Sequence, residues 1–154
     1  MGFLSVCEPL LEGNEKKYLC QAIDEGEVSS HGKFVRKFEE EFSKWSGNDY
    51  VVAVCNGTAA LETAIYGLGL KGGRLGIPNN TIISCLLAAI RAGVTAHPYE
   101  THDPYHKCLE ENLMRCHLFG NFDESVATNF LIDDCSQYWK PFRVQDVACY
   151  SLYA

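Results

Sequence analysis

Apolar residues recur along this chain with two spacings, one typical of helices and one typical of strands. The helical spacing predicts four helices, at about residues 14–25, 32–46, 58–67 and 81–92. Three of them are followed by a glycine that can end a helix, at Gly26, Gly47 and Gly93. Short apolar runs predict strands at residues 50–54, 74–78, 94–98, 113–119, 130–132 and 147–151.

Strands that alternate with helices indicate an α/β fold with a mainly parallel sheet. We expect a three-layer α/β/α sandwich, with residues 1–154 forming a single domain. In it, helices at about 14–46 precede a region of sheet and helices at about 50–154. The second helix carries an aromatic stripe at helical spacing, which predicts a core-facing side formed by Phe34, Val35, Phe38, Phe42 and Trp45.

The composition is typical of a soluble globular protein, with 47% hydrophobic and 21% charged residues. A net charge of −7 argues against nucleic acid or an anionic membrane as the main partner. The first residues lack a signal-peptide pattern, and no apolar run approaches membrane-spanning length. We therefore expect a cytoplasmic protein.

Eight cysteines raise the question of disulfides or a metal site. None lies in a C-x-x-C pair, and several sit inside apolar runs, as reduced and buried cysteines do: Cys20, Cys55, Cys85, Cys116 and Cys149. A mixed group of possible metal ligands comprises His102, His106, Cys108, Cys116 and His117. Its spacing fits no zinc pattern, so the sequence predicts no metal.

The junction at residues 50–61 is the most informative segment. The apolar run at 50–54 leads into an Asn-Gly pair, and a helix then opens with Thr58 and two alanines. A helix N-terminus offers unpaired backbone N–H groups and a partial positive charge, and small residues let a phosphate approach closely. The alternative is an ordinary connection between strand and helix in which Thr58 is the N-cap.

Polar residues follow several of the predicted strands. Pro78-Asn79-Asn80-Thr81 follows one strand, Asp133 and Asp134 end another, and Ser151 lies on the last. Because ligands of parallel sheets bind beyond the carboxyl ends of the strands, an anion-binding turn, a carboxylate and a hydroxyl would face one crevice.

A family resemblance rests on ordered motifs along nearly the whole chain. They are the segments at residues 27–39 and 56–61, Pro78-Asn79-Asn80-Thr81, His117-Leu118-Phe119-Gly120, the segment at 132–137 and the segment at 149–154. With these motifs the chain resembles the N-terminal part of the DegT/DnrJ/EryC1/StrS family. Members of that family are pyridoxal-phosphate (PLP) sugar aminotransferases of fold type I.

The resemblance implies a role for each matched residue. Residues Gly57, Thr58 and Ala59 would hold the cofactor phosphate, through the Thr58 and Ala59 amides and the Thr58 hydroxyl, and Ser151 would add a hydrogen bond. Asp134 would pair with the pyridine nitrogen, and Gln137 would lie near the 3-oxygen of the ring. The structural alternatives are a helix N-cap for Asp134 and a solvated helix residue for Gln137.

The chain also departs from the family pattern. The Schiff-base lysine of the family would fall two residues beyond Ala154, and neither Lys140 nor Lys107 can be carried over to that role. Ile82 stands where the family usually has an aromatic residue that stacks on the ring. We therefore expect a truncated aminotransferase large domain that is inactive alone.

Three interpretations follow from this resemblance and its departures. In the first, the completed enzyme would move an amino group from a glutamate-type donor onto a keto-sugar nucleotide, as a homodimer or with a partner subunit. In the second, the chain is a non-catalytic module that binds PLP or pyridoxamine phosphate, or that dimerises. In the third, it is an unrelated α/β binding domain that shares only the strand-end geometry.

Overall fold

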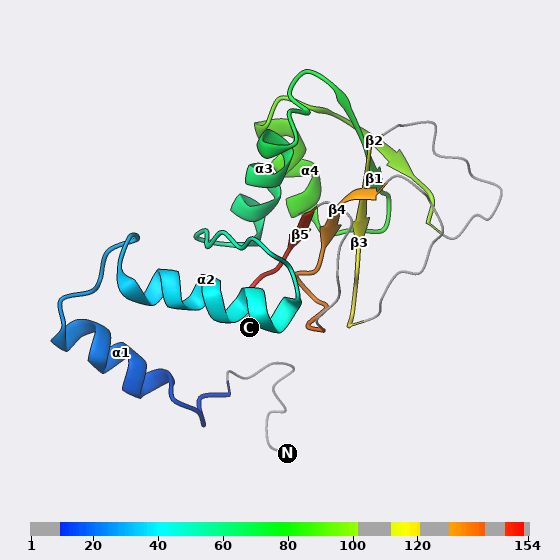
Figure 1. Ribbon diagram of the computed structural model, residues 1–154. Coiled ribbons are helices and arrows are strands. Elements are labelled where there is room, and N and C mark those ends of the chain that lie inside the picture. The colour runs from blue at the N-terminus through cyan, green and yellow to red at the C-terminus, as the bar shows by residue number, and fades with distance from the viewer. Residues whose placement is uncertain (1–9, 102–111, 121–129, 141–146, 153–154) are drawn as a thin grey trace, which may run out of the picture. The chain divides into compact units, whose positions relative to one another are not determined.

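A five-stranded parallel sheet organises the second part of the chain (Figure 1). The computed structural model describes residues 10–101, 112–120, 130–140 and 147–152. The strands lie side by side in the order β2-β1-β3-β4-β5, and every neighbouring pair is parallel. Their bounds are β1 Arg74–Pro78, β2 Thr95–Tyr99, β3 Leu113–Cys116, β4 Phe130–Asp134 and β5 Val147–Cys149.

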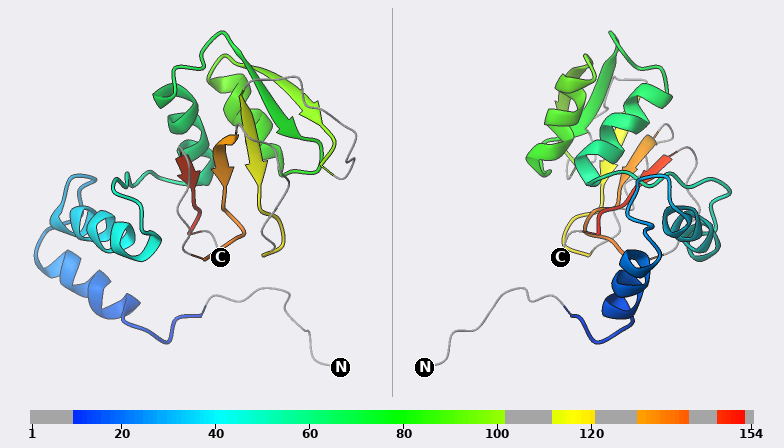
Figure 2. Two further views of the ribbon diagram at one scale, coloured as in Figure 1. Left: turned by 45° about the vertical axis from the view of Figure 1, so that its right-hand side comes forward. Right: turned by 90° about the vertical axis from the view of Figure 1, so that its left-hand side faces the viewer.

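Helices α3 (Gly57–Gly67) and α4 (Ile83–Arg91) pack against each other on one face of this sheet (Figure 2). Their inward residues join those of the strands in one hydrophobic core. Small residues such as Ala88 and Ala89 let α4 approach the sheet closely. The largest fully buried apolar side chains of this core are Leu61, Ile65, Leu75, Met114 and Ile132.

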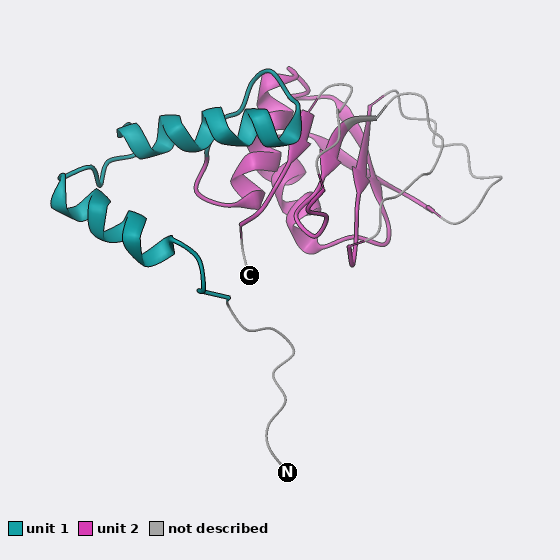
Figure 3. Ribbon diagram, turned by 60° about the horizontal axis from the view of Figure 1, so that its bottom comes forward, with its two compact units in different colours: residues 1–53, 154 teal, residues 54–153 magenta. Residues whose placement is uncertain are grey.

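The chain divides into two compact units, residues 1–53 with residue 154, and residues 54–153 (Figure 3). In the first unit, α1 spans Glu15–Asp24 and α2 spans Lys33–Ser46. Gly26 follows α1 with a φ of 68°, and Gly47 ends α2 with a φ of 75°. These left-handed conformations favour glycine, which explains why the chain stops both helices there.

The four predicted helices are confirmed, with α4 beginning two residues later than expected. Five of the six predicted strands are confirmed as well: β1 has the predicted bounds, and the ends of the other four differ from the prediction by at most three residues. The parallel α/β architecture is therefore the one that the alternating pattern indicated. Whether residues 1–154 behave as one domain stays a prediction.

The predicted strand at residues 50–54 is wrong. The structure has no strand there, and Tyr50 and Val52 are largely exposed. The amide of Ala53 donates to a carboxylate oxygen of Glu39 at 2.9 Å instead of joining a ladder. An apolar run becomes a strand only when another strand pairs with it, and the sequence pattern does not supply that partner.

Two burial predictions also fail. The aromatic stripe of α2 is not core, because Phe38 and Trp45 remain 37% and 38% exposed. Neighbouring rings of the stripe do contact each other, with 5.0 Å between the centroids of Phe42 and Trp45 and an angle of 54° between the ring planes. Cys20 and Cys55 are exposed, whereas Cys85, Cys116 and Cys149 are buried as predicted. All of these cysteines are free thiols.

Candidate functional site

The N-terminus of α3 is capped by Asn56. Its backbone is extended, with a φ of −168°, and its side-chain oxygen accepts a hydrogen bond from the Ala59 amide at 2.9 Å. Thr58 is therefore not the N-cap but lies in the first turn of the helix. The Gly57 and Thr58 amides belong to the first turn as well, where backbone N–H groups have no acceptor within the helix.

Gly57 is buried where two serines meet this helix end. A Cβ atom built on Gly57 would lie 3.1 Å from the Ser136 hydroxyl and 3.1 Å from the Ser151 Cβ. Both distances are shorter than ordinary van der Waals contact, so a larger residue would require Ser136 and Ser151 to shift by a few tenths of an ångström. The residues that follow β4 and β5 thus bring two hydroxyl groups to the N-terminus of α3.

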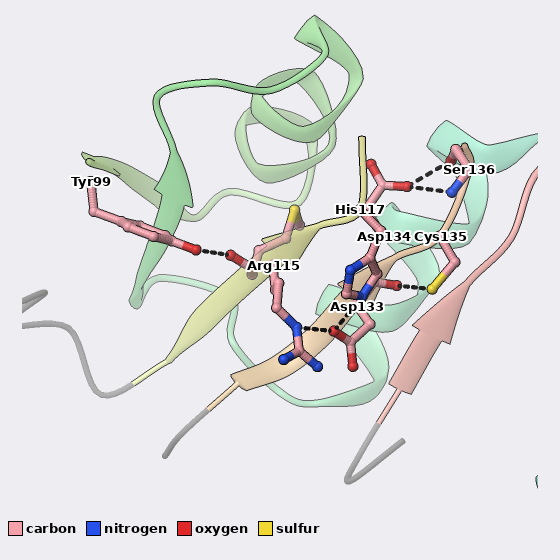
Figure 4. Close-up of polar contacts among 8 residues, drawn as sticks. Tyr99, Arg115, His117, Asp133, Asp134, Cys135 and Ser136 are labelled. Atoms are coloured by element: carbon pink, nitrogen blue, oxygen red, sulfur yellow. Dashed lines mark hydrogen bonds and ion pairs between the residues drawn. The ribbon is translucent and has the colours of Figure 1, made fainter. Parts of the chain in front are cut away.

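Asp134 is the last residue of β4, and its side chain is buried (Figure 4). One carboxylate oxygen, Oδ1, accepts from the Ser136 amide at 3.0 Å and from the Ser136 hydroxyl at 2.6 Å. The other, Oδ2, accepts from the Cys85 thiol at 3.1 Å. Residues 135–140 contain a turn and no helix, so Asp134 orders a turn and does not cap a helix.

Ser151 and Gln137 have defined contacts. The Ser151 carbonyl accepts a hydrogen bond from the Trp139 indole at 3.1 Å. Gln137 is exposed, and its side-chain oxygen accepts from the Phe119 amide at 3.0 Å. Phe119 has a left-handed φ of 56°, so Gln137 stabilises an uncommon turn after β3. Gln137 therefore binds the Phe119 amide, which is not among the hydrogen-bond partners of Asp134.

A cluster that sequence reasoning missed surrounds Oδ2 of Asp134. The Cys85 and Cys116 sulfurs are 3.6 Å apart, and the Thr81 hydroxyl lies 3.2 Å from the first and 3.0 Å from the second. The hydrogen bond with Cys116, burial and the nearby Asp134 charge all raise the pKa of the Cys85 thiol. The only sign of this cluster in the sequence was the position of its residues, because Thr81 and Cys85 follow β1 and Cys116 is the last residue of β3.

A second polar cluster, formed by Arg115, His117 and Asp133, connects β3 to β4. Asp133 Oδ1 accepts from Arg115 Nε at 2.7 Å and lies 3.1 Å from His117 Nε2 (Figure 4). Burial raises the pKa of the Asp133 carboxyl, but the hydrogen bonds from His117 and Arg115 outweigh it, and the pKa falls below its usual value. These contacts fix the strand ends that present Asp134.

Residues 9–114 match the DegT/DnrJ/EryC1/StrS aminotransferase family. The chain belongs to this family. The resemblance seen in the sequence motifs is thereby confirmed.

Individual relatives agree with the family assignment. The chain is 30% identical to GDP-perosamine synthase of Vibrio cholerae over 87% of its own length and 42% of that protein. The crystal structure of 3-amino-5-hydroxybenzoic acid synthase superposes with a TM-score of 0.76 at 26% identity, covering 94% of this chain and 45% of that one.

A third relative has its cofactor in place. GDP-4-keto-6-deoxy-D-mannose-3-dehydratase of Escherichia coli, with hydrated PLP bound, superposes with a TM-score of 0.70 at 15% identity, covering 84% of this chain and 40% of that one. It shows the shared fold alone. The chain thus spans less than half the length of each of these three relatives.

The family assignment confirms the predicted fold class, a mainly parallel α/β fold like that of fold type I PLP enzymes. It also implies PLP as the cofactor of the family. Among the helices that the structure describes, none has the length and apolar character needed to cross a membrane.

Proposed function

We propose that this chain supplies the phosphate and pyridine-nitrogen side of a PLP pocket in a nucleotide-sugar aminotransferase. Completed by the rest of such an enzyme, it would serve the transfer of an amino group from a glutamate-type donor to a keto-sugar nucleotide. The assembly would be a cytoplasmic homodimer or a pair with a partner subunit.

One observation carries this proposal: Ser136 connects the two ends of the site. Its hydroxyl lies beside Gly57 at the N-terminus of α3, and the same hydroxyl donates to Asp134. A helix N-terminus lined by the Ser136 and Ser151 hydroxyls suits a phosphate group. A buried carboxylate at the far side of Ser136 suits a protonated ring nitrogen.

The residues fit the cofactor in their chemistry. Oδ2 of Asp134 already accepts a hydrogen bond from a thiol, and a pyridinium N–H can take that place as a stronger donor. When bound, PLP supplies an electron-withdrawing ring that stabilises negative charge at the carbon bearing the amino group. Asp134 would keep the ring nitrogen protonated, while Thr58 and Ser151 would anchor the phosphate.

For Gln137 to approach the ring oxygen, its side chain would have to leave the Phe119 amide. We propose that the covalent lysine of the pocket lies outside these 154 residues. The chain alone would therefore bind PLP or pyridoxamine phosphate without a covalent bond, and it would not transfer amino groups.

Calorimetric titration of the purified chain with pyridoxamine phosphate tests this proposal. We expect saturable binding that weakens about tenfold or more in Asp134→Asn, because a charge-assisted hydrogen bond is lost. Thr58→Ala, at the half-buried phosphate end, is a second variant that leaves the core intact. The exposed Asp49→Asn is the matched control. Absence of binding by the folded chain, or equal affinity in all variants, would contradict the proposal.

Borohydride trapping tests the absence of a covalent link. After incubation with PLP and reduction, mass spectrometry should find no single lysine carrying the pyridoxyl group in stoichiometric yield. Stoichiometric labelling of one residue, Lys140 for example, would overturn the non-covalent part of the proposal.

A further inference from the structure

Trp139 joins the turn after β4 to the chain that follows β5. Its indole N–H donates a hydrogen bond to the Ser151 carbonyl at 3.1 Å. Its ring also meets the Tyr150 ring edge-on, with 5.9 Å between the two centroids. We propose that Trp139 is a positioning residue for the phosphate group of the cofactor, and that it acts by fixing the backbone of Ser151. The inference rests on the proposed function, in which the Ser151 hydroxyl binds that phosphate.

Ser151 lies outside the strand that leads to it. β5 ends at Cys149, whose carbonyl accepts from the Cys135 amide at 2.7 Å, and residues 150–152 follow the end of the strand. Ser151 is half-buried, and a backbone carbonyl withdrawn from water needs a hydrogen-bond partner. The Trp139 indole provides one, so a side chain from the β4 turn takes over where the ladder of β5 stops.

The position of Ser151 matters because its side chain lies at the N-terminus of α3. A Cβ atom built on Gly57 would lie 3.1 Å from the Ser151 Cβ and 3.5 Å from the Ser151 hydroxyl oxygen. Hydrogen bonds weaken steeply when their geometry departs from the optimum. A small displacement of the Ser151 backbone would therefore weaken the hydrogen bond between its hydroxyl and a phosphate at this helix end.

The other end of this connection is anchored to Asp134. Trp139 belongs to residues 135–140, the segment that begins directly after Asp134. Ser136 holds this segment to the Asp134 carboxylate through its amide and its hydroxyl, and the Gln137 side chain holds it to the chain after β3. One short segment thus carries both contacts. Trp139 would therefore keep the phosphate end of the pocket at a fixed distance from the carboxylate that meets the ring nitrogen.

The chemistry of tryptophan suits this role. The indole N–H is a donor only, so it can serve the Ser151 carbonyl without accepting the proton of a neighbouring hydroxyl. The ring is rigid and has only two rotatable side-chain bonds. Trp139 is also 44% exposed, so its removal should disturb the core less than removal of a buried ring would. Phenylalanine at this position removes the donor and keeps an aromatic ring beside Tyr150.

Calorimetric titration of the full chain with two probes tests this inference. The probes are pyridoxamine phosphate and pyridoxamine, which differ only in the phosphate. Trp139→Phe should weaken binding of pyridoxamine phosphate by about fivefold, as the loss of one neutral hydrogen bond predicts, and should leave binding of pyridoxamine unchanged. Trp45→Phe, the same change at the other tryptophan of the chain, is the matched control and should leave both affinities unchanged.

A double-mutant cycle tests whether Trp139 acts through Ser151. Ser151→Ala should weaken binding of pyridoxamine phosphate by about tenfold, because a hydrogen bond to a charged group is lost. Adding Trp139→Phe to Ser151→Ala should weaken it by less than about twofold further. Two losses that add in full would overturn the inference.

The remaining outcomes separate this inference from the proposed function. Equal weakening of both probes in Trp139→Phe would show a general structural role and overturn the inference. If the parent chain binds pyridoxamine phosphate and folded Trp139→Phe binds it equally well, the inference alone is overturned. A folded parent chain that binds neither probe overturns the proposed function and this inference with it. Should Trp139→Phe fail to fold, hydrogen exchange of the Trp139 indole N–H in the parent chain decides, since it should slow when pyridoxamine phosphate binds, and an unchanged rate overturns the inference.

Discussion

The described residues of the second unit contain a buried apolar core, whereas those of the first unit leave their apolar side chains exposed or only partly buried. Every buried apolar residue that the structure describes lies between Leu61 and Cys149. In contrast, α1 has no buried residue and α2 buries only Ser46. Yet the helices of both units were predicted equally well from sequence. Periodicity and capping glycines therefore indicate where a helix forms, but not whether its apolar face is covered.

This difference makes paired substitutions informative, with one member in each unit. The pair with the largest expected difference in stability is Ile65 in α3 and Ile23 in α1, whose side chains are 0% and 67% exposed. Ile65→Ala should lower the free energy of unfolding by about 3 kcal/mol, because it removes buried methyl groups and leaves a cavity. Ile23→Ala should change it by less than about 0.5 kcal/mol.

Urea denaturation followed by circular dichroism measures both variants of this pair. The contrast between the two units would be contradicted if Ile23→Ala lowered the free energy of unfolding as much as Ile65→Ala does. Such a result would mean that a contact covers the apolar face of α1 in solution.

Part of the site could be predicted from the sequence. Asp134 and Ser151 were placed at strand ends that meet α3, because parallel strands end at a common edge, and the structure bears this out through Ser136 and Gly57. The turn at Asp134 and the helix cap at Asn56 could be identified only from the backbone geometry of the structure. Both depend on local angles that a pattern of residue types does not contain.

The contacts that the sequence did not predict are long-range. Cys85 meets Cys116 only because β3 lies next to β1 in the sheet, so the residues after one strand face the end of the other. Strand order is set by packing over the whole sheet, and spacing along the chain does not report it. The same reason explains the failed strand at residues 50–54, which has the composition of a strand but no pairing partner among the described residues.

An ion pair in each unit gives the second comparison. Asp133 is buried with Arg115, whereas Glu41 pairs with Lys44 on the exposed surface of α2 at 2.8 Å. Asp133→Asn should destabilise the protein by about 2 kcal/mol at neutral pH, since hydrogen bonds to a buried charge are lost. Glu41→Gln should leave the melting temperature unchanged, because exposed pairs contribute little.

The pH dependence of this pair has a definite sign. The folded pKa of Asp133 lies below its usual value, so its contribution to stability is present above about pH 4 and is lost as the pH falls through the folded pKa. Asp133→Asn should therefore lose part of the acid sensitivity of the parent chain in melts between pH 7 and pH 2. An unchanged pH profile would show that the carboxylate is not paired in solution.

Two glycines at helix ends give the third comparison. Gly93 follows α4 with a φ of 72°, and Gly47 ends α2 with a φ of 75°. Alanine at either position is strained by about 1 kcal/mol. Gly93→Ala should lower the free energy of global unfolding by that amount, whereas Gly47→Ala should only fray α2. Amide hydrogen exchange separates the two results, and equal global losses would show that both units unfold together.

The smallest expected difference concerns two asparagines that both precede a helix. The side chain of Asn56 accepts a hydrogen bond from the Ala59 amide, whereas Asn14 makes no side-chain cap to α1. Asn56→Ala should therefore cost about 1 kcal/mol of unfolding free energy, and Asn14→Ala should cost nothing measurable. Asn56→Ser is the control, because serine keeps an acceptor for the same amide and should recover most of the loss. If Asn14→Ala proved equally costly under the same denaturant titration, then α1 would be capped and packed in solution, and the contrast between the units would be smaller than the burial of their side chains indicates.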